Sequence, residues 1–257
     1  MTPSVTASSG STSRGDPLQW QDEGVVLAVR RHGESSAVAS LLTRAHGRHA
    51  GLVRGGAGQR ARPVWQPGNR LQVAWRARLA EQLGSFTGEL LAPIAAVLLD
   101  DPGRLLGMGS ACALLDATLP ERDPHPGLYD ALLEWLNELV HGVAWREDYV
   151  RFEVALLAEL GFGLDLSACA VTGTTDDLAF VSPRSGRAVS RAGAGPYAPR
   201  LLPLPSFLVG KKPADLDQVR DGLRLTGAFL RRHIFDASER PMPAARERFA
   251  SWLTARE

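Results

Sequence analysis

The sequence predicts a two-part α+β fold, in which a small β-barrel over residues 18–92 is followed by a mainly helical domain over residues 93–257. Before Pro93 the apolar residues recur at every second position, as they do in β-strands. After Pro93 they recur about every 3.6 positions, as they do on one face of an α-helix. Residues 163–206 interrupt the helical pattern with many Gly, Pro, Ser and Thr residues, which predicts a small irregular or β insertion.

The first 17 residues are rich in Ser, Thr and Gly and contain no apolar stretch, so we expect a disordered tail and no secretory signal. Cys112 and Cys169 are the only cysteines, too few for a disulfide scaffold. No run approaches the ~18 apolar residues of a membrane span. We therefore expect a cytoplasmic protein without membrane contact.

The strand pattern begins at Gly24–Arg31, where Val25, Leu27 and Val29 are expected on one side. Four further runs follow: Ser36–Thr43, His49–Arg54, Asn69–Leu79 and Leu83–Leu90. Five short strands within about 70 residues are typical of a closed or nearly closed barrel of the oligonucleotide-binding (OB) type. A long connection rich in Gly and Arg joins the third and fourth runs, and its Trp65 is expected to pack on the barrel rather than stack on a base.

Helical periodicity defines five segments of the second domain. These are residues 103–118, 127–141, 145–160, 215–236 and 244–254. Leu128, Leu132 and Trp135 form part of one apolar stripe, and Phe152 and Leu156 form part of another. Such aliphatic and aromatic stripes are expected to form helical core rather than a ligand pocket.

The net charge of +1 conceals an uneven distribution. Residues 1–80 contain 11 Lys and Arg against 4 Asp and Glu, a balance of +7, whereas residues 81–257 contain 18 against 24, a balance of −6. Within residues 24–80 there are ten arginines and a single acid, Glu34. This stretch favours a polyanion such as nucleic acid, and the alternative is a solvated basic face that keeps sheet edges from pairing.

Several of these arginines lie where a phosphate could be bound. Arg54, Arg60 and Arg62 flank the glycines of the long connection, where the backbone can approach a ligand closely. Arg70 and Arg76 lie on the polar face of the fourth strand. A guanidinium binds phosphate in a bidentate manner and stays charged at any working pH. From charge and strand facing we infer that Arg60, Arg62, Arg70 and Arg76 contact nucleic acid.

Nothing in the sequence predicts catalysis. The glycine-rich pieces GLVRGG and GGAGQR lack the Lys-Ser/Thr of a P-loop, and no dinucleotide-binding fingerprint opens a helix after a strand. The serines lie in no recognisable nucleophile setting, and the six histidines are scattered. We therefore expect that the protein is not an enzyme and has no catalytic residues.

The segment from Cys169 to Gly173 has the outline of a Cys-x-x-Cys-Gly zinc knuckle with Thr172 in place of the second cysteine. No cysteine follows it, so the segment cannot supply four thiolates. We expect a degenerate zinc-ribbon-like insertion that holds neither zinc nor another cofactor. Cys112 lies in an apolar helical segment and is expected to be a small core residue.

With these pieces placed, the chain resembles the RecO family of bacterial DNA repair proteins, from about Gln19 to Arg232. In the first half the matching residues are Glu23–Leu27, Arg31–Ser35, Leu42–Arg48, Arg54-Gly55, Gln66-Pro67 and Leu71–Val73. In the second half they are Arg151–Glu153, Leu156-Leu157, Leu160–Phe162, Cys169 with Thr172-Gly173, and Leu225–Gly227 with Phe229-Leu230. Each motif is weak alone, but their order and spacing together are specific.

The resemblance implies an N-terminal OB barrel joined to a mainly helical domain. It implies binding to single- and double-stranded DNA, annealing of complementary strands and a role in the RecF recombination pathway. It also implies RecR and the single-stranded DNA-binding protein as partners, with RecA loading as the outcome. Arg31, Arg44, Arg48 and Arg54 lie in matched segments and are assigned DNA contact on that basis.

Many members of the family carry a four-cysteine zinc module in the helical domain. This chain keeps the place but not the ligands, so the insertion is expected to fold around apolar contacts such as Leu178, Phe180 and Leu201.

The acidic helical half is the better candidate for protein contacts. Arg231, Arg232 and His233, near a helix end, could rim a pocket for the acidic, Phe-ended tail of the single-stranded DNA-binding protein, although favourable interaction with the helix dipole explains them equally well. The leading hypothesis is a non-enzymatic DNA-repair mediator. Two alternatives stay open: an RNA-binding OB protein, and an adaptor whose basic face binds an acidic protein.

Overall fold

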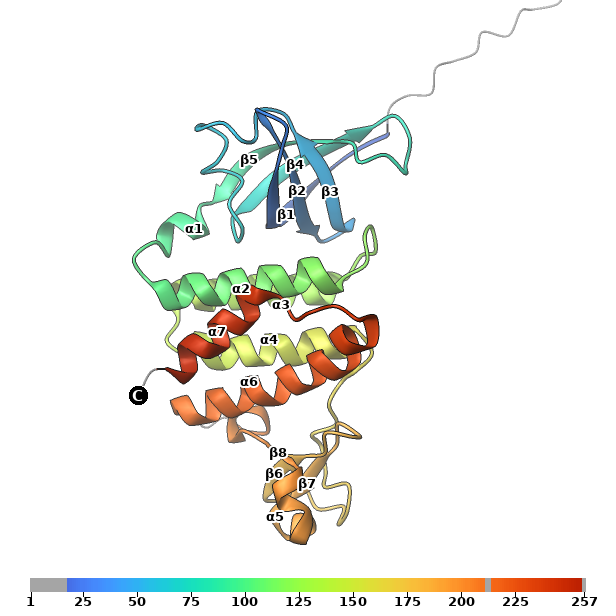
Figure 1. Ribbon diagram of the computed structural model, residues 1–257, viewed down its shortest axis with the longest axis vertical. Coiled ribbons are helices and arrows are strands. Elements are labelled where there is room, and N and C mark those ends of the chain that lie inside the picture. The colour runs from blue at the N-terminus through green and yellow to red at the C-terminus, as the bar shows by residue number, and fades with distance from the viewer. Residues whose placement is uncertain (1–17, 211–213, 256–257) are drawn as a thin grey trace, which may run out of the picture.

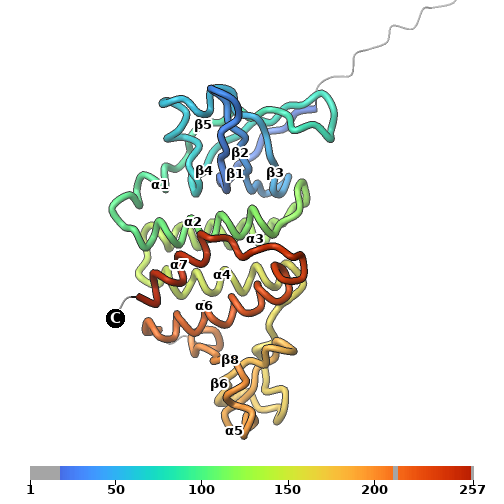
Figure 2. Tube along the Cα trace, in the orientation of Figure 1, coloured from blue at the N-terminus to red at the C-terminus, as the bar shows by residue number. Residues whose placement is uncertain are grey.

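The computed structural model describes residues 18–210 and 214–255, and the predicted tail of residues 1–17 lies outside the described residues. The described part is elongated, with the barrel at one end, a layer of helices in the middle and the insertion at the other end (Figures 1 and 2). The predicted two-part α+β fold is therefore confirmed.

Five strands form the barrel. They are β1 (Leu18–His32), β2 (Ser36–Thr43), β3 (Gly47–Val53), β4 (Arg70–Ala77) and β5 (Ser85–Ala92). Neighbouring strands follow the order β1-β2-β3-β5-β4, and β4 pairs again with β1, so the pairings close on themselves. All neighbours are antiparallel except β3 and β5, whose parallel contact consists of Leu52–Ser85 and Val53–Phe86.

The middle of β1, residues 24–27, is buried on both faces, because one face lines the barrel and the other rests on the helices. Val26 and Val29 pack in the barrel interior, whereas Val25 and Leu27 join the helical core. A β-bulge between Val26 and Ala28 shifts the register against β2. The expectation that Val25, Leu27 and Val29 share one side was therefore wrong for Val29.

Aromatic rings fill the end of the barrel at which β1 and β3 begin. The ring centroid of Trp75 lies 5.8 Å from that of Trp20 and 4.7 Å from that of His49. Trp75 is buried. Burial of the His49 ring, with contributions from Arg122 and His46, lowers the pKa of His49 to about 4, so the ring is neutral near pH 7.

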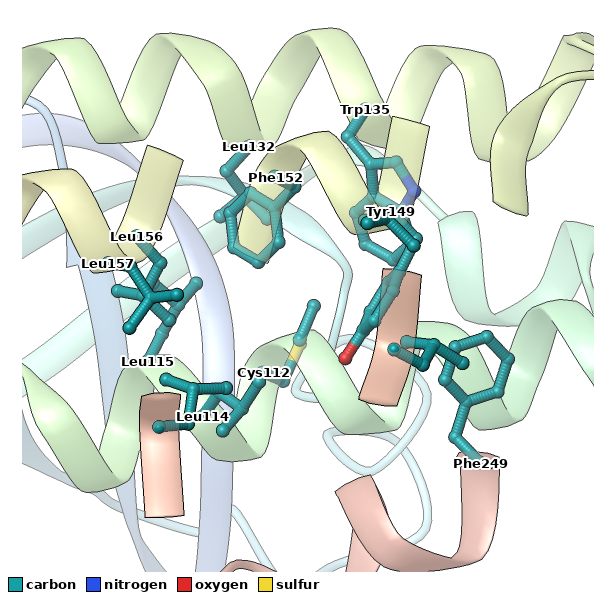
Figure 3. Close-up of a cluster of buried hydrophobic side chains, with 14 of the residues drawn as sticks. Cys112, Leu114, Leu115, Leu132, Trp135, Tyr149, Phe152, Leu156, Leu157 and Phe249 are labelled. Atoms are coloured by element: carbon teal, nitrogen blue, oxygen red, sulfur yellow. The ribbon is translucent and has the colours of Figure 1, made fainter. Parts of the chain in front are cut away.

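The helical layer begins with the short α1 (Ile94–Val97), which leads away from the barrel. Its main helices are α2 (Pro102–Thr118), α3 (Pro126–His141), α4 (Trp145–Glu159), α6 (Leu216–Leu230) and α7 (Ala244–Thr254). Figure 3 shows side chains of α2, α3 and α4 turned towards one another, among them Cys112, Trp135 and Phe152. Cys112 is a core residue, as predicted, and burial raises the pKa of its thiol to about 12.

The barrel rests on α2, the long helix that lies directly below it in Figure 1. Val25, Leu27 and Leu42 of the barrel belong to the same apolar cluster as Met108 and Cys112 of α2. The two parts of the fold therefore share one hydrophobic core, which fixes the orientation of the barrel on the helices.

Several predicted element boundaries were wrong, and the largest difference is that the first strand begins at Leu18 rather than Gly24. The fifth strand begins at Ser85 rather than Leu83, because Gly84 has φ +66° and the carbonyl of Leu83 accepts a hydrogen bond from Trp75 Nε1. The helix predicted over residues 215–236 ends as an α-helix at Leu230 and continues as a π-helical turn, Arg231–Phe235, and a 3₁₀ turn, Asp236–Ser238. The later start of the fifth strand and the π-helical turn leave the apolar pattern of the sequence unchanged, so that pattern could not reveal them.

The insertion lies between α4 and α6 and contains a small three-stranded sheet. Its elements are β6 (Leu178–Val181), β7 (Ala188–Ser190), α5 (Arg191–Ala194), a 3₁₀ turn (Gly195–Arg200), β8 (Leu202–Pro203) and a second 3₁₀ turn (Ser206–Leu208). Leu178, Phe180 and Leu201 pack against a small buried cluster that includes Cys169 and Val189. The predicted apolar contacts of the insertion are therefore confirmed.

One buried ion pair joins three helices of the layer. Arg246 of α7 donates to both carboxylate oxygens of Glu153 of α4, at 2.5 and 2.9 Å, and Thr226 Oγ1 of α6 donates to the same carboxylate. Arg246 also donates to the carbonyl of Leu223 at 2.8 Å. Glu153 and Thr226 are 0% exposed and Arg246 is 4% exposed, so each charge depends on the other for compensation.

Arg246→Met is expected to lower the free energy of unfolding by about 3–5 kcal/mol, because it leaves the Glu153 carboxylate buried without a partner. Urea unfolding measures the loss. Arg248→Met on the exposed side of the same helix is the control, with an expected change within about 0.5 kcal/mol. Equal losses in the two variants would show that the pair does not stabilise the helices.

Candidate nucleic-acid interface

The connection between β3 and β4, residues 54–69, lies directly on the barrel. Gly55 has φ +68°, a left-handed conformation that favours glycine. A Cβ at Gly56 would lie 3.0 Å from the Cβ atoms of Ala37 and Val53, so a larger residue would push these neighbours apart. The glycines seen in the sequence therefore shape the path of the connection.

Two side chains fix the far end of the connection. Trp65 is 5% exposed and packs against Phe86, with ring centroids 6.3 Å apart, so the predicted packing role of Trp65 is confirmed. Asn69 Nδ2 donates to the carbonyl of Pro63 at 2.9 Å, and Asn69 Oδ1 accepts from the backbone N–H of Ala95 at 3.0 Å. The arginines of the connection therefore project from an anchored backbone.

A hollow of about 400 Å³ lies between the connection, β1 and β2. Its lining residues are Val29, Arg31, Ala37, Gly56, Ala57, Arg62, Trp65, Gln66 and Pro67. Arg31 and Arg62 supply positive charge, and the Gln66 side chain donates to the carbonyl of Arg62 at 2.9 Å. The sequence reasoning missed Gln66, because a lone glutamine before a proline carries no signal of a site.

Four of the predicted arginines gather around this hollow and its connection: Arg31, Arg54, Arg60 and Arg62. All four are exposed, and none forms an ion pair with an acidic side chain among residues 18–210 and 214–255. Arg31 donates to the backbone carbonyl of Glu34 at 3.2 Å, which leaves its charge uncompensated. We name Arg31, Arg54, Arg60 and Arg62 the arginine end of the barrel. Four uncompensated guanidinium groups on a fixed backbone suit a chain of phosphates.

Three other predicted arginines are engaged in ion pairs. Arg44 forms a bidentate pair with Asp130 of α3, with N–O distances of 3.0 and 2.8 Å. The hydrogen bond from Arg44 lowers the pKa of Asp130 from its usual value. Arg70 pairs with Glu23 at 2.9 Å across β1 and β4.

Arg48 is the most enclosed of the three, with a side chain only 17% exposed. Its Nε donates to the carbonyl of Leu119 at 2.8 Å, and its guanidinium lies 3.5 Å from Asp116 and 3.4 Å from Glu121. Arg44 and Arg48 therefore join the barrel to the helical layer. The structure does not bring them together with the arginine end.

Arg76 lies on the outer face of β4 and donates to Gln19 Oε1 at 2.9 Å, a neutral partner. At the same end of the barrel the Trp20 ring stacks on His46, with centroids 4.0 Å apart and an interplanar angle of 8°. The His46 ring is held by Asp22, with 3.1 Å between His46 Nδ1 and Asp22 Oδ2. Trp20 precedes the predicted first strand, which is why the alternating pattern gave no sign of this stack.

The residues predicted to bind a partner point in different directions. Arg231 lines a groove of about 510 Å³ between α6 and α7. Arg232 donates to the carbonyl of Pro183 in the insertion at 3.2 Å. His233 stacks between Phe162 and Phe229, at centroid distances of 4.9 and 5.7 Å. Consecutive residues of a helix lie on different faces, so these three neighbours do not rim a single pocket.

Two features are absent from the described ranges. Across residues 18–210 and 214–255, no three His, Cys, Asp or Glu side chains come together in a way that could hold a metal ion. Over the same ranges no helix has both the length and the apolar character needed to span a membrane.

The chain is similar to known recombination proteins along most of its length. Residues 18–94 match the family described as Recombination protein O N terminal, and residues 99–240 match Recombination protein O C terminal. The chain is 55% identical to a protein named DNA repair protein RecO from Rhodospirillum centenum, over 90% of this chain and 93% of the relative. It is 50% identical to proteins of the same name from Rhodospirillum rubrum, over 92% and 96%, and from Rhizobium etli, over 90% and 91%.

The division between paired and unpaired arginines predicts different effects on stability. Arg48→Ala is expected to lower the free energy of unfolding by about 1–3 kcal/mol, because the Leu119 carbonyl and the Asp116 carboxylate lose a charged donor in a half-buried setting. Arg54→Ala is expected to change it by no more than about 0.5 kcal/mol. Chemical denaturation compares the two, and an equal effect would contradict the division.

Proposed function

Because the chain belongs to the RecO family of DNA repair proteins, we propose that it is a non-enzymatic cytoplasmic mediator that binds DNA through the arginine end of its barrel. In this proposal it anneals complementary strands and helps load the recombinase RecA in the RecF pathway. The observation that supports it best is the set of four uncompensated arginines around the hollow. Single-stranded and double-stranded DNA both present the phosphates that such a set would bind.

The arginine end suits the phosphate backbone rather than the bases. The aromatic side chain in the lining of the hollow, Trp65, is packed on the barrel and is not available for stacking. Phosphate contacts position a nucleic acid without reading its sequence. An annealing protein must accept any sequence, so contacts of this kind are the ones it requires.

Charge neutralisation gives a physical route to annealing. Two DNA strands repel each other through their phosphates, and bound guanidinium groups reduce that repulsion. Contacts of this type weaken steeply with salt, since binding releases condensed counterions. Exposed arginines on a surface also release DNA readily, which a mediator needs after the strands have paired.

We further propose RecR and the single-stranded DNA-binding protein as partners. For the acidic, Phe-ended tail of the latter we propose the groove between α6 and α7. Its apolar floor includes Leu223, Ala228 and Met242, and its edges carry Arg224 and Arg231. The Arg231–Glu247 contact is 3.7 Å long between two exposed side chains, a weak pair that a carboxylate-rich peptide could replace.

The triple variant Arg54→Ala/Arg60→Ala/Arg62→Ala is expected to lose annealing activity at low salt. The log–log slope of single-stranded DNA affinity against salt is expected to fall in magnitude by about 2, at ~0.7 for each phosphate that is no longer neutralised. A matched control removes three exposed arginines outside the barrel, Arg184, Arg200 and Arg248. Unchanged annealing in the first variant would exclude the arginine end as the site.

The same assays separate the alternatives. Tighter binding of RNA than of single-stranded DNA of the same sequence would favour an RNA-binding protein. Absence of any gel shift at ~50 mM salt would favour an adaptor that binds an acidic protein, since a polyanion site responds under those conditions.

For the partner groove, the double variant Arg224→Glu/Arg231→Glu is expected to weaken binding of an acidic peptide ending in Phe by 10-fold or more, through charge reversal at both edges. Fluorescence anisotropy with a labelled peptide measures this, and a peptide of the same composition with the Phe moved inward controls for charge alone. Equal binding by the variant and the original chain would place the tail elsewhere.

A further inference from the structure

Four positions of the insertion meet at one point, in two pairs of equal spacing. Cys169 and Thr172 form one pair, and Ser190 and Gly193 form the other, each with two residues between its members. The backbone N–H groups of Thr172 and Ser190 point at Cys169 Sγ, at 3.4 and 3.2 Å. A Cβ added to Gly193 would lie 2.9 Å from the same sulfur.

This is the arrangement that a four-thiolate zinc site requires. Two x-x-spaced pairs on facing turns place four side chains around one centre, where zinc binds each sulfur at about 2.3 Å. The residues present do not fit zinc, because they supply one thiol, two neutral hydroxyl groups and, at Gly193, no side chain at all. Ser190 Oγ occupies the centre instead, 3.3 Å from Cys169 Sγ and 3.5 Å from Thr172 Oγ1.

We propose that this segment is a metal-free knuckle, in which the sulfur of Cys169 holds the two turns together as a hydrogen-bond acceptor in place of a zinc ion. Four donors converge on that sulfur. They are the N–H groups of Val171, Thr172 and Ser190 and the hydroxyl group of Ser190. Donors from both turns meet on one atom, as ligands from both turns would meet on a metal.

Backbone hydrogen bonds close the first turn of the knuckle and tie it to β7. Cys169 N–H donates to the carbonyl of Thr174 at 2.7 Å, and Gly173 N–H donates back to the carbonyl of Cys169 at 2.9 Å. Gly173 has φ +75°, which glycine adopts without strain. Ala170 N–H donates to the carbonyl of Ala188, which ties the first turn to β7 at 2.8 Å.

The sulfur suits this role because its surroundings favour negative charge on it. Burial by itself raises the pKa of Cys169, but hydrogen bonds from Ser190 and Thr172 outweigh it and lower the pKa to about 6. A thiolate is a stronger acceptor than a thiol, so the same donors bind it more tightly. Cys169 is 2% exposed, so these hydrogen bonds are shielded from water.

Hydrogen exchange on the full chain tests the acceptor role without any assay of DNA binding. Cys169→Ala is expected to speed exchange of the Thr172 and Ser190 amides by about 10-fold, since each loses its acceptor, while amides of the barrel and of α2 stay unchanged. Cys169→Ser keeps a weaker acceptor and is expected to fall between. Val171→Ala, which truncates an exposed side chain in the same turn, is the control. Exchange in Cys169→Ala equal to that of the original chain would overturn the proposal.

The zinc content of the purified protein is a second test of the proposal. The chain, purified without a metal-affinity tag and dialysed against zinc, is expected to retain no stoichiometric zinc. The triple variant Thr172→Cys/Ser190→Cys/Gly193→Cys is expected to retain one zinc ion per chain and to lose it to a chelator. Stoichiometric zinc in the original chain would overturn the metal-free assignment. If the triple variant folds, as judged by hydrogen exchange in its helices, and yet binds no zinc, the four positions do not converge as proposed. If it fails to fold, the hydrogen exchange of Cys169→Ala decides.

Discussion

The ion pair between Glu153 and Arg246 lies where α4, α6 and α7 meet, and water reaches neither charge to any useful extent. Two charges in that position are tolerated only when they face each other with their remaining hydrogen bonds made. The pair therefore fixes the relative position of the three helices. α7 also packs on α2, and α2 supports the barrel through the shared apolar cluster that contains Val25 and Leu42. The ion pair thus holds together the helices on which the barrel rests.

Carboxylates of the helical layer also decide which arginines of the barrel remain available. Asp116 and Asp130 lie opposite Arg48 and Arg44 and compensate their charges at the junction. The arginine end lies away from these acids, on a connection whose path is set by Gly55 and Gly56. A strongly basic stretch of sequence is in this way divided into cations that hold the fold together and cations that face solvent.

Much of the fold could be predicted, because strands and helices impose periods of two and 3.6 on the apolar residues. The interruption at Val26–Ala28 and the π-helical turn after Leu230 were missed, since a bulge or a wider turn displaces residues without changing their type. For the candidate site, the sequence shows which arginines are present but not which of them pair with an acidic side chain. Arg44 and Asp130 are 86 residues apart in the chain, so their pairing depends on the packing of barrel on helices, which local pattern does not contain. The second pair of the knuckle was missed for a similar reason: Ser190 and Gly193 are unremarkable residue types until the fold places them beside Cys169.

The brief contact between β3 and β5 has a mechanical consequence for the barrel. Every other pair of neighbouring strands is held along most of its length, whereas this seam consists of two residue pairs, Leu52–Ser85 and Val53–Phe86. Local opening of a closed sheet begins where the fewest hydrogen bonds must break. Val53 is followed at once by Arg54, so the seam lies next to the first arginine of the connection. A force on Arg54 would therefore act first on the β3–β5 pairing, where the fewest hydrogen bonds must break. The other strand pairs of the barrel would stay intact.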